Sequence, residues 1–482
     1  MTQVKAKTAG TRNIASMNAM PSPVFDREMI SRYDIAGPRY TSYPAAPHFS
    51  PRFGEAEFRD AARASNEDPI PRRLSIYVHV PFCFSPCFYC GCARIITRDR
   101  GKADGYLQRL HREIELTAPL FDRDRTVVQV HFGGGTPNFL DTRQMADLLQ
   151  TLDQNFSLNR GADREFGIEL DPRDAGPDYV KMLAEHGFNR LSVGIQDFDP
   201  EVQAAVNRIQ SVEQTRAVLE AAREYGFRST SVDLIYGLPK QTLSSFARTL
   251  DEVIALKPDR IAAYGYAHLP ERFKAQRQIE TNELPDAATR LALLGLTIQT
   301  LTAAGYRYIG MDHFALRGDD LSRAQDHGTL QRNFQGYSTH AACDLIGLGM
   351  SAIGHVGNTF SQNAKDLVGY YAALDAGCLP VVRGMTLDED DVIRADLLQR
   401  LMCNGVIDIA AFEARHPIDF EVYFASDLDR LRALAADGLV VVSPDRIAVT
   451  SRGRLLLRII AMCFDAHLVR QRGEGVSYSK AL

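Results

Sequence analysis

Apolar and polar positions along residues 73–267 follow two alternating patterns. Six short runs rich in β-branched and aromatic residues predict strands at 74–80, 127–132, 166–170, 190–195, 230–235 and 261–267. Between these runs, apolar residues recur at helical spacing and predict helices at 102–119, 142–152, 177–185, 212–225 and 243–256. Because strands that alternate with helices build βαβ units, we predict an α/β fold whose parallel sheet is open or curls into a partial barrel.

The predicted strands end at polar or glycine-rich residues. These are Cys83 after the first strand, 133–136 (Gly-Gly-Gly-Thr) after the second, Glu169, Gln196 and Asp233 at or near the ends of the next three, and Ala267 at the end of the sixth. Ligands of parallel α/β folds bind beyond the carboxyl ends of the strands. We therefore expect these residues to meet in one site.

Beyond about residue 365 the pattern changes to helices. Residues 428–434 predict a helix, which a short β-hairpin around Pro444 and a closing helix at 452–463 follow, as in a winged-helix unit. Few basic residues precede Arg452, which favours a structural or substrate-covering role over DNA binding. We predict an N-terminal extension and covering segment at 1–72, a partial barrel at 73–364, and a mostly helical, winged-helix-like domain at 365–482.

Composition narrows the possible partners and locations. The chain has 482 residues, 45% of them hydrophobic, and a net charge of −5, which argues against a general nucleic-acid binder. No apolar run approaches the roughly 20 residues that span a bilayer, and the first 25 residues lack a secretory segment, so we expect a cytoplasmic protein. The basic stretch before Asp26 is interpreted as a disordered extension, with a transit peptide as the alternative.

Four of the eight cysteines, Cys83, Cys87, Cys90 and Cys92, lie within ten residues. Three thiolates at these spacings can hold one polynuclear iron–sulfur centre from a single loop. A four-iron cluster with only three cysteine ligands keeps an open coordination position, which is typical of a reactive metal site. The alternative is a structural zinc site with Cys92 as the fourth ligand, although such sites usually pair two Cys-x2-Cys units across a longer spacer.

The remaining polar residues at the strand ends are candidates for ligand binding. Glycines without a Cβ let backbone groups of residues 133–135 face a ligand, or they simply form a tight turn. Buried carboxylates such as Glu169 and Asp233 need partners, which a ribose diol, an amino group or an internal salt bridge would provide. Arg208 could hold a carboxylate. His79 and His131 are candidates for proton transfer, or are simply satisfied buried histidines.

Together these motifs resemble those of the radical S-adenosylmethionine (SAM) superfamily. More narrowly, nearly the whole chain is similar to the family of oxygen-independent coproporphyrinogen III oxidases. The matching stretches are 37–44 (GPRYTSYP), 77–83 (YVHVPFC), 90–92 (CGC), 131–137 (HFGGGTP), 188–198 (FNRLSVGIQDF), 233–239 (DLIYGLP), 266–270 (YAHLP), 310–315 (GMDHFA) and 332–337 (RNFQGY).

The resemblance implies a partial (β/α)6 barrel with one [4Fe–4S] cluster on Cys83, Cys87 and Cys90, and with Cys92 outside the ligand set. The open iron would bind SAM, and one electron would cleave SAM to methionine and a 5′-deoxyadenosyl radical. That radical would remove a hydrogen from a propionate of coproporphyrinogen III. Loss of CO2 would leave a vinyl group, and two rounds would give protoporphyrinogen IX in haem biosynthesis.

The resemblance also implies two bound SAM molecules and a set of residues around them. Glu169 and Asp233 are expected among the catalytic residues together with the cluster cysteines. The expected cofactor contacts are Tyr77, Tyr89, Gly91, Gly134, Gly135, Thr136, Glu169, Gln196, Arg208, Asp233, Ala267 and Ile353, with Gln335 as a further candidate near the second SAM. Tyr89 stands where the family pattern has Phe, and Phe-Ser-Pro fills the interval after Cys83.

The expected partners follow from the same chemistry. Coproporphyrinogen III carries four carboxylates, and Arg39 is our candidate for contacting one of them. An unidentified low-potential electron donor and a final electron acceptor are implied, and we expect a monomer. A haem chaperone of the same superfamily is the main rival, but Cys92 and the segment 38–44 (PRYTSYP) favour the oxidase.

Overall fold

The computed structural model describes residues 20–340 and 342–470. The basic extension, for which the sequence left a disordered segment or a transit peptide open, lies largely outside the described residues. None of the described helices is long and apolar enough to cross a membrane.

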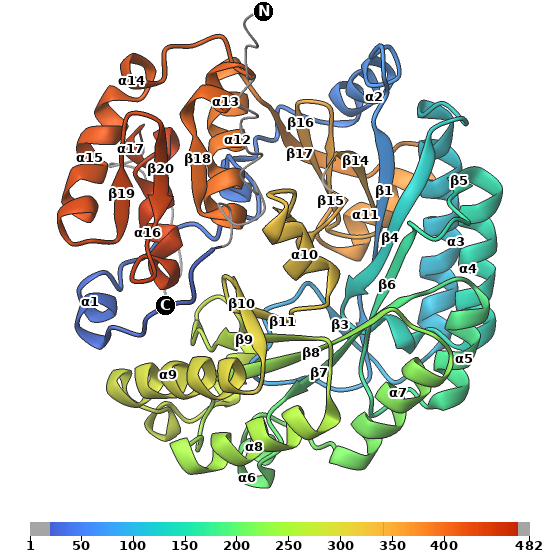
Figure 1. Ribbon diagram of the computed structural model, residues 1–482. Coiled ribbons are helices and arrows are strands. Elements are labelled where there is room, and N and C mark those ends of the chain that lie inside the picture. Colours follow the sequence, from blue (N-terminus) through green and yellow to red (C-terminus); the bar gives the residue numbers. More distant parts are fainter. Residues whose placement is uncertain (1–19, 341, 471–482) are drawn as a thin grey trace, which may run out of the picture.

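Six parallel strands lie side by side in sequence order and curve into a partial barrel (Figure 1). This confirms the partial (β/α)6 barrel that the family resemblance implied, which is one of the two forms that the strand–helix alternation allowed. The strands are β1 (Arg73–Val80), β4 (Thr126–Gly134), β6 (Glu165–Leu170), β7 (Arg190–Gln196), β8 (Ser229–Tyr236) and β9 (Arg260–Gly265).

The sheet extends beyond this barrel at both edges. Antiparallel β11 (His313–Leu316) and then β10 (Tyr306–Gly310) follow β9, while β14 (Cys343–Leu348) pairs in parallel with β1. A meander of β15 (Ile353–Val356), β16 (Thr359–Asn363) and β17 (Val381–Thr386) continues the second edge. The sheet therefore runs past residue 364, where the sequence suggested that the barrel would end. The strand–helix alternation could not reveal these strands, because antiparallel strands pair without it.

The connecting helices lie on the outer face of the sheet (Figure 1). Asp141, Ser211 and Thr242 each accept a hydrogen bond at the N-terminus of their helix, which explains where three of these helices begin. The helices are α3 (Gly101–Thr117), α4 (Thr142–Asn155), α5 (Pro177–Glu185), α6 (Pro200–Ala205), α7 (Val212–Glu224), α8 (Leu243–Leu256), α9 (Ala287–Ala303) and, beside α3, α11 (Leu367–Asp375).

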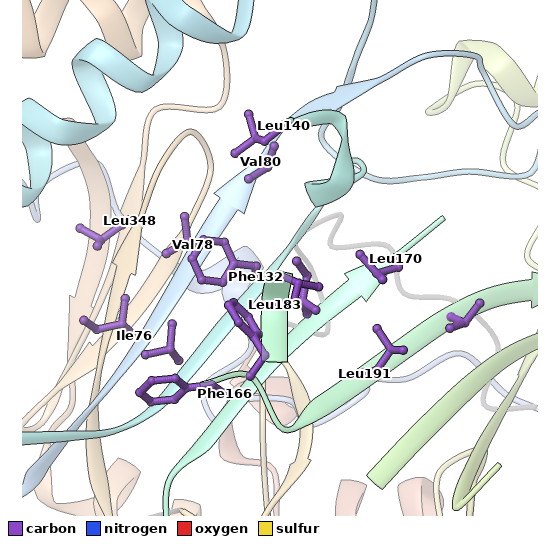
Figure 2. Close-up of a cluster of buried hydrophobic side chains, with 14 of the residues drawn as sticks. Ile76, Val78, Val80, Phe132, Leu140, Phe166, Leu170, Leu183, Leu191 and Leu348 are labelled. Carbon is purple, nitrogen blue, oxygen red and sulfur yellow. The ribbon is translucent and has the colours of Figure 1, made fainter. Parts of the chain in front are cut away.

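Strand β1 shows how the sequence separates the core from the site. Successive side chains of a strand point to opposite faces of the sheet. Ile76, Val78 and Val80 are fully buried in the layer between sheet and helices, beside Phe132 and Leu348 (Figure 2). The alternate positions carry polar side chains, which consequently face the inside of the barrel.

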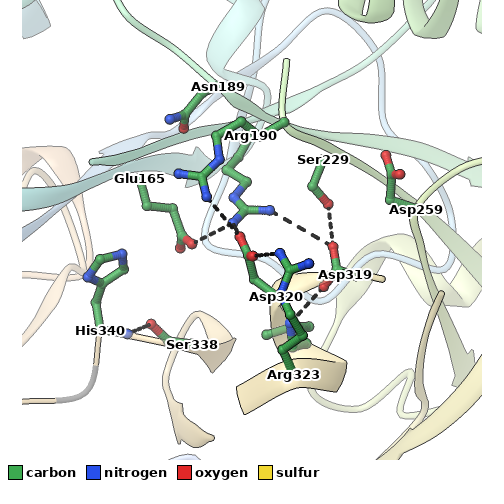
Figure 3. A network of polar contacts seen from close by, with 12 residues as sticks. Glu165, Asn189, Arg190, Ser229, Asp259, Asp319, Asp320, Arg323, Ser338 and His340 are labelled. Carbon is green, nitrogen blue, oxygen red and sulfur yellow. Dashed lines mark hydrogen bonds and ion pairs between the residues drawn. The ribbon is translucent and has the colours of Figure 1, made fainter. Parts of the chain in front are cut away.

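A charged network closes the barrel at the amino ends of the strands (Figure 3). Arg190 at the start of β7 binds Asp320 of α10 (Asp320–Asp326), and Arg260 at the start of β9 lies 2.9 Å from Asp319. Asp319 also accepts a hydrogen bond from Ser229 at 2.9 Å. The opposite end, where the strands finish, is thus left for ligands.

The C-terminal part forms a smaller unit with its own apolar core. Its three-stranded sheet has the order β18 (Val406–Asp408), β20 (Arg446–Val449), β19 (Val440–Val442). The expected closing helix at 452–463 is a 3-10 turn, Arg454–Leu456, followed directly by α16 (Leu457–Met462). The other helices are α12 (Glu389–Asn404), α13 (Ile409–Glu413), α14 (Phe420–Tyr423), α15 (Ala425–Ala436) and α17 (Ala466–Arg470).

The N-terminal segment joins the two parts of the molecule. It carries α1 (Arg27–Arg32) and α2 (Glu55–Ala64) and runs between the barrel and the C-terminal unit (Figure 1). Tyr40 and Tyr43 are buried in the apolar core of the C-terminal unit, to which Ile309 and Met311 of the barrel edge also contribute. The segment and the C-terminal unit therefore pack on the barrel together.

Candidate active site

The cysteine loop leaves β1 and returns to it through a short pair of strands. Backbone pairing of β2 (Phe82–Cys83) with β3 (Ile95–Ile96) closes the loop at its base. Cys83, Cys87 and Cys90 are free thiols, and all three line one cavity of about 190 Å³, called here the cysteine cavity. Such a set of convergent thiols fits three ligands of an iron–sulfur cluster.

The geometry also bears on the zinc alternative. Among the residues that the structure describes, no three His, Cys, Asp or Glu side chains lie close enough together to hold one metal ion. A four-iron cluster offers each thiolate a separate iron, so three thiols on the wall of one cavity suffice as its ligands.

Three arginines support the cysteine loop. Arg94 donates to the carbonyl oxygen of Cys90 at 3.0 Å and to that of Cys87 at 3.3 Å. Nη1 of Arg208 and Nη2 of Arg173 lie 3.6 and 3.8 Å from Sγ of Cys87. Two of these guanidinium groups thus place positive charge beside Cys87.

Asp171 holds two of these arginines in place. It accepts hydrogen bonds from Arg173 at 2.6 Å and from Arg208 at 3.0 Å. The sequence interpretation included Arg208 but missed Asp171, Arg173 and Arg94. The signal for the first two was available, since Asp171-Pro172-Arg173 directly follows the third predicted strand.

The glycine loop approaches the cysteine loop more closely than other residues would allow. Gly134 has a φ of +118°, and a Cβ there would lie 2.6 Å from the His79 ring. A Cβ on Gly135 would lie 2.7 Å from the backbone of Pro81. Thr136 donates to Sγ of Cys83 at 3.3 Å. The glycines therefore fit the two loops together, and Gly134, Gly135 and Thr136 also line the cysteine cavity.

Three of the residues expected at the strand ends, Glu169, Gln196 and Asp233, meet in the cysteine cavity, whereas Ala267 lines a neighbouring cavity. Glu169, Gln196, Arg208 and Asp233 line the cysteine cavity together with Tyr89. Asp233 accepts a hydrogen bond from Ser192 at 3.4 Å, and burial, followed by the nearby charge of Glu169, raises its pKa to about 7. An arginine, two carboxyl groups and an amide around one cavity can bind a ligand that carries a carboxylate, an amino group and a ribose.

A larger cavity of about 730 Å³, called here the mouth cavity, adjoins the cysteine cavity. The two share Tyr89, Cys90, Cys92, Gln196 and Asp233. Gly91 and Ala267 lie on the wall of the mouth cavity, and β9 ends at Gly265, so that Ala267 belongs to the loop after the strand. The wall further includes Arg39, Tyr264, Arg290, Tyr308, Asp312 and Arg458.

A third cavity of about 150 Å³, called here the inner cavity, lies inside the barrel. Glu169 and Asp233 line both the inner cavity and the cysteine cavity, and Gln335 lines the inner cavity. Tyr77 and Ile353 line none of these three cavities. The hydroxyl of Tyr77 lies 3.1 Å from Nδ1 of His79, and Ile353 begins β15.

The histidines take different positions. His131 lines the inner cavity and places Nε2 3.4 Å from Oε1 of Glu169. Nε2 of His79 lies 2.9 Å from the carbonyl oxygen of Ala93 in the cysteine loop. His79 is therefore a satisfied buried residue that supports the loop, whereas His131 contacts a candidate site residue.

Comparison with known proteins gives consistent matches over most of the chain. A profile of the radical SAM superfamily matches residues 77–253, and one of the HemN C-terminal domain matches residues 387–456. An oxygen-independent coproporphyrinogen III oxidase from Pseudomonas aeruginosa is 50% identical over 444 residues, which cover 92% of this chain and 96% of that protein. The Escherichia coli K12 protein of the same name is 48% identical over 458 residues, with 95% and 98% covered.

A solved structure agrees with these matches. Coproporphyrinogen III oxidase (HemN) from Escherichia coli, a radical SAM enzyme, has a TM-score of 0.88 at 47% identity, and the match covers 93% of this chain and 100% of that chain. Membership of the radical SAM superfamily implies a [4Fe–4S] cluster and SAM, and the three convergent thiols fit such a cluster. The chain belongs to the family of oxygen-independent coproporphyrinogen III oxidases within the radical SAM superfamily.

Proposed function

We propose that this chain oxidatively decarboxylates two propionate side chains of coproporphyrinogen III to vinyl groups and so forms protoporphyrinogen IX. The observation that carries this proposal is the shared wall of the cysteine cavity and the mouth cavity. A cofactor on the three thiols would lie directly beside a cavity of about 730 Å³ that is lined by several cations.

Cys83, Cys87 and Cys90 would hold the cluster, and Cys92, which lines both the cysteine cavity and the mouth cavity, would stay outside the ligand set. The cluster and SAM together supply one-electron radical chemistry that no protein side chain offers. Arg208, held by Asp171, would orient the SAM carboxylate. Asp233, Glu169 and Gln196 would bind its polar groups, while Gly134, Gly135, Thr136 and Tyr89 would shape the surrounding wall.

A second SAM is part of the proposal. Glu169 and Asp233 line both the cysteine cavity and the inner cavity, so polar groups for another ligand are present next to the first site. Gln335 on the inner cavity is a candidate contact. Tyr77 and Ile353, which line none of the three cavities, are the least supported of the proposed SAM contacts.

The mouth cavity suits a macrocycle with several carboxylates. Its cations come from three separate segments: Arg39 from the N-terminal segment, Arg290 from α9 and Arg458 from α16. The partly exposed Arg39 lies 3.5 Å from Asp312, and a propionate could replace Asp312 as its partner. Such cations would orient the substrate so that one propionate lies toward the cysteine cavity.

The C-terminal unit would cover the substrate. Nε of Arg458 donates to the carbonyl oxygen of Pro38 at 3.0 Å, and the same guanidinium binds the carbonyl of Gly37. Helix α16 thereby fixes the N-terminal segment directly before Arg39. Such a cover would limit the access of water to the cavity, which protects a radical reaction from side reactions, and the contacts support a covering role over DNA binding.

Anaerobic turnover tests the proposal. The protein is reconstituted with iron and sulfide and incubated with dithionite, SAM and coproporphyrinogen III, and the oxidised porphyrins and 5′-deoxyadenosine are separated by chromatography. Protoporphyrin with two deoxyadenosines per molecule is expected. Deoxyadenosine without vinyl products, or transfer of bound haem to an acceptor protein without decarboxylation, would refute the proposed reaction and favour the haem chaperone.

The cellular setting is proposed on general grounds. We infer a monomer in the cytoplasm that takes its electron from a low-potential donor and passes another to a final acceptor. The reaction itself requires both, because reductive SAM cleavage consumes one electron and vinyl formation releases one.

A further inference from the structure

A hairpin of two short strands carries a buried cation with no anionic partner. The hairpin pairs β12 (Gln331–Asn333) with β13 (Gly336–Ser338). Arg332 is only 5% exposed, and its Nε and Nη1 atoms are buried without a hydrogen-bond partner among the described residues. Its guanidinium lies over the ring of Tyr337 at 5.1 Å, which satisfies neither nitrogen.

Burying such a cation lowers the free energy of unfolding unless an anion neutralises the charge. A buried charge without a counter-ion loses its hydration and gains little in return, so buried arginines are normally paired. Arg125, which is 4% exposed, shows the usual solution in this chain, since it lies 2.5 Å from Asp344 and 2.8 Å from both Ser65 and Asn66. Arg332 lacks any equivalent partner in the described chain.

Arg332 lies on the wall of a fourth cavity of about 370 Å³, called here the hairpin cavity. Among the described residues of that wall, the only carboxylate belongs to Asp396, which already lies 3.1 Å from Arg400 and 3.0 Å from His416. Phe334, His355 and Phe360 add aromatic surface to the wall. A group in this cavity that neutralises Arg332 would therefore have to be a bound anion.

The hairpin cavity adjoins the proposed active site. Asn333 and Ser338 line both this cavity and the inner cavity, which Glu169 and Asp233 also line. Gln335, at the turn of the hairpin, faces the inner cavity, and its Nε2 is likewise buried without a partner. Arg332 and Gln335, two residues of one hairpin, thus carry buried donors without a partner on the walls of the two neighbouring cavities.

We propose that Arg332, with Gln335 as a neighbouring donor, binds a carboxylate of a ligand that enters the barrel. This inference rests on the proposed function, which supplies two sources of that carboxylate: a propionate of the porphyrinogen, or the second SAM. A guanidinium can pair with a carboxylate through two parallel hydrogen bonds, which gives both affinity and orientation.

The test uses the reconstituted full-length protein and three variants. Arg332→Met removes the charge at similar length, Arg332→Lys keeps the charge without the planar fork, and Arg317→Met removes an exposed arginine as the control. Equilibrium dialysis measures the number of SAM molecules bound per chain, fluorescence quenching measures the affinity for coproporphyrin III, and thermal unfolding measures stability without ligand.

Arg332→Met should weaken one of these ligands by about 10- to 100-fold, the range for a hydrogen bond to a charged group. Arg332→Lys should recover part of that loss. The unfolding midpoint of Arg332→Met should stay the same or rise, because the variant removes a buried charge without a partner. A merely structural arginine would instead lower the midpoint and leave both affinities unchanged.

The outcomes separate the two sources. Weaker coproporphyrin binding with unchanged SAM binding assigns the carboxylate to the substrate, and loss of one SAM with unchanged coproporphyrin binding assigns it to the second SAM. Unchanged binding of both ligands overturns the inference. If the unmodified protein converts coproporphyrinogen III while Arg332→Met matches it in every assay, only this inference fails. If the unmodified protein forms no vinyl product, the proposed function itself fails.

Discussion

Replacing Gly135 by alanine tests whether the glycine loop positions the cysteine loop. The added Cβ would lie 2.7 Å from the carbonyl carbon and oxygen of Pro81 and 2.8 Å from the carbonyl oxygen of Phe82. Backbone atoms cannot rotate away as a flexible side chain does. One of the two loops must therefore move by about 0.7 Å before an ordinary van der Waals contact is restored.

The expected magnitude follows from this displacement. Overpacking of this kind costs about 1–3 kcal/mol of stability. A shift approaching 1 Å in a loop that positions reacting groups can also lower a rate by about 100-fold. Gly135→Ala should therefore lower the unfolding midpoint, the iron and sulfide content after reconstitution, and the rate of 5′-deoxyadenosine formation.

Two glycines provide matched controls. A Cβ on Gly318 would have no neighbour within 4 Å, so Gly318→Ala should behave like the unmodified protein. A Cβ on Gly384 in β17 would lie 2.1 Å from the carbonyl oxygen of Phe360, so Gly384→Ala should lower stability while folded protein still takes up iron. Full iron content and an unchanged rate in Gly135→Ala would refute the positioning role.

Other residues give further predictions. Cys83→Ser should abolish both the visible absorbance of the cluster and SAM cleavage, whereas Cys92→Ser should keep the absorbance; a colourless Cys92→Ser protein would make Cys92 a ligand. Arg125→Met should lower the free energy of unfolding, measured with denaturant, by about 3–5 kcal/mol, because it leaves Asp344 buried without its partner at 2.5 Å. A decrease below about 1 kcal/mol would contradict this. The pKa of Asp233, raised by burial to about 7, lies above its ordinary value of 3.8, so the ligand-free protein should lose stability as the pH rises from about 4 to 7. Asp233→Asn should flatten that dependence, and an equally steep slope in the variant would assign it to another group.

The barrel could be predicted because its signals are local. Helices α5 (Pro177–Glu185) and α8 (Leu243–Leu256) begin and end where their apolar spacing and capping residues indicate. The strands of the barrel are short runs rich in β-branched and aromatic residues, and they end at polar or glycine-rich residues. Six such ends in register were enough to indicate one site at the carboxyl edge of the sheet.

The second edge of the sheet could not be predicted in the same way. Strand β14 joins β1 by pairing Arg73 with Cys343, across most of the barrel sequence, and no local pattern specifies such a partner. The mouth cavity likewise collects Arg39, Arg290 and Arg458 from three distant segments. Contacts of this kind depend on how complete elements pack, which a single sequence does not reveal.

Isotope transfer during turnover tests the central claim most directly. Coproporphyrinogen III carrying deuterium on the β-carbons of its propionates is incubated with the reconstituted protein, SAM and dithionite, and the 5′-deoxyadenosine is analysed by mass spectrometry. The proposed reaction predicts one deuterium in each deoxyadenosine that accompanies a new vinyl group. Vinyl products accompanied only by unlabelled deoxyadenosine would contradict hydrogen abstraction from the propionate.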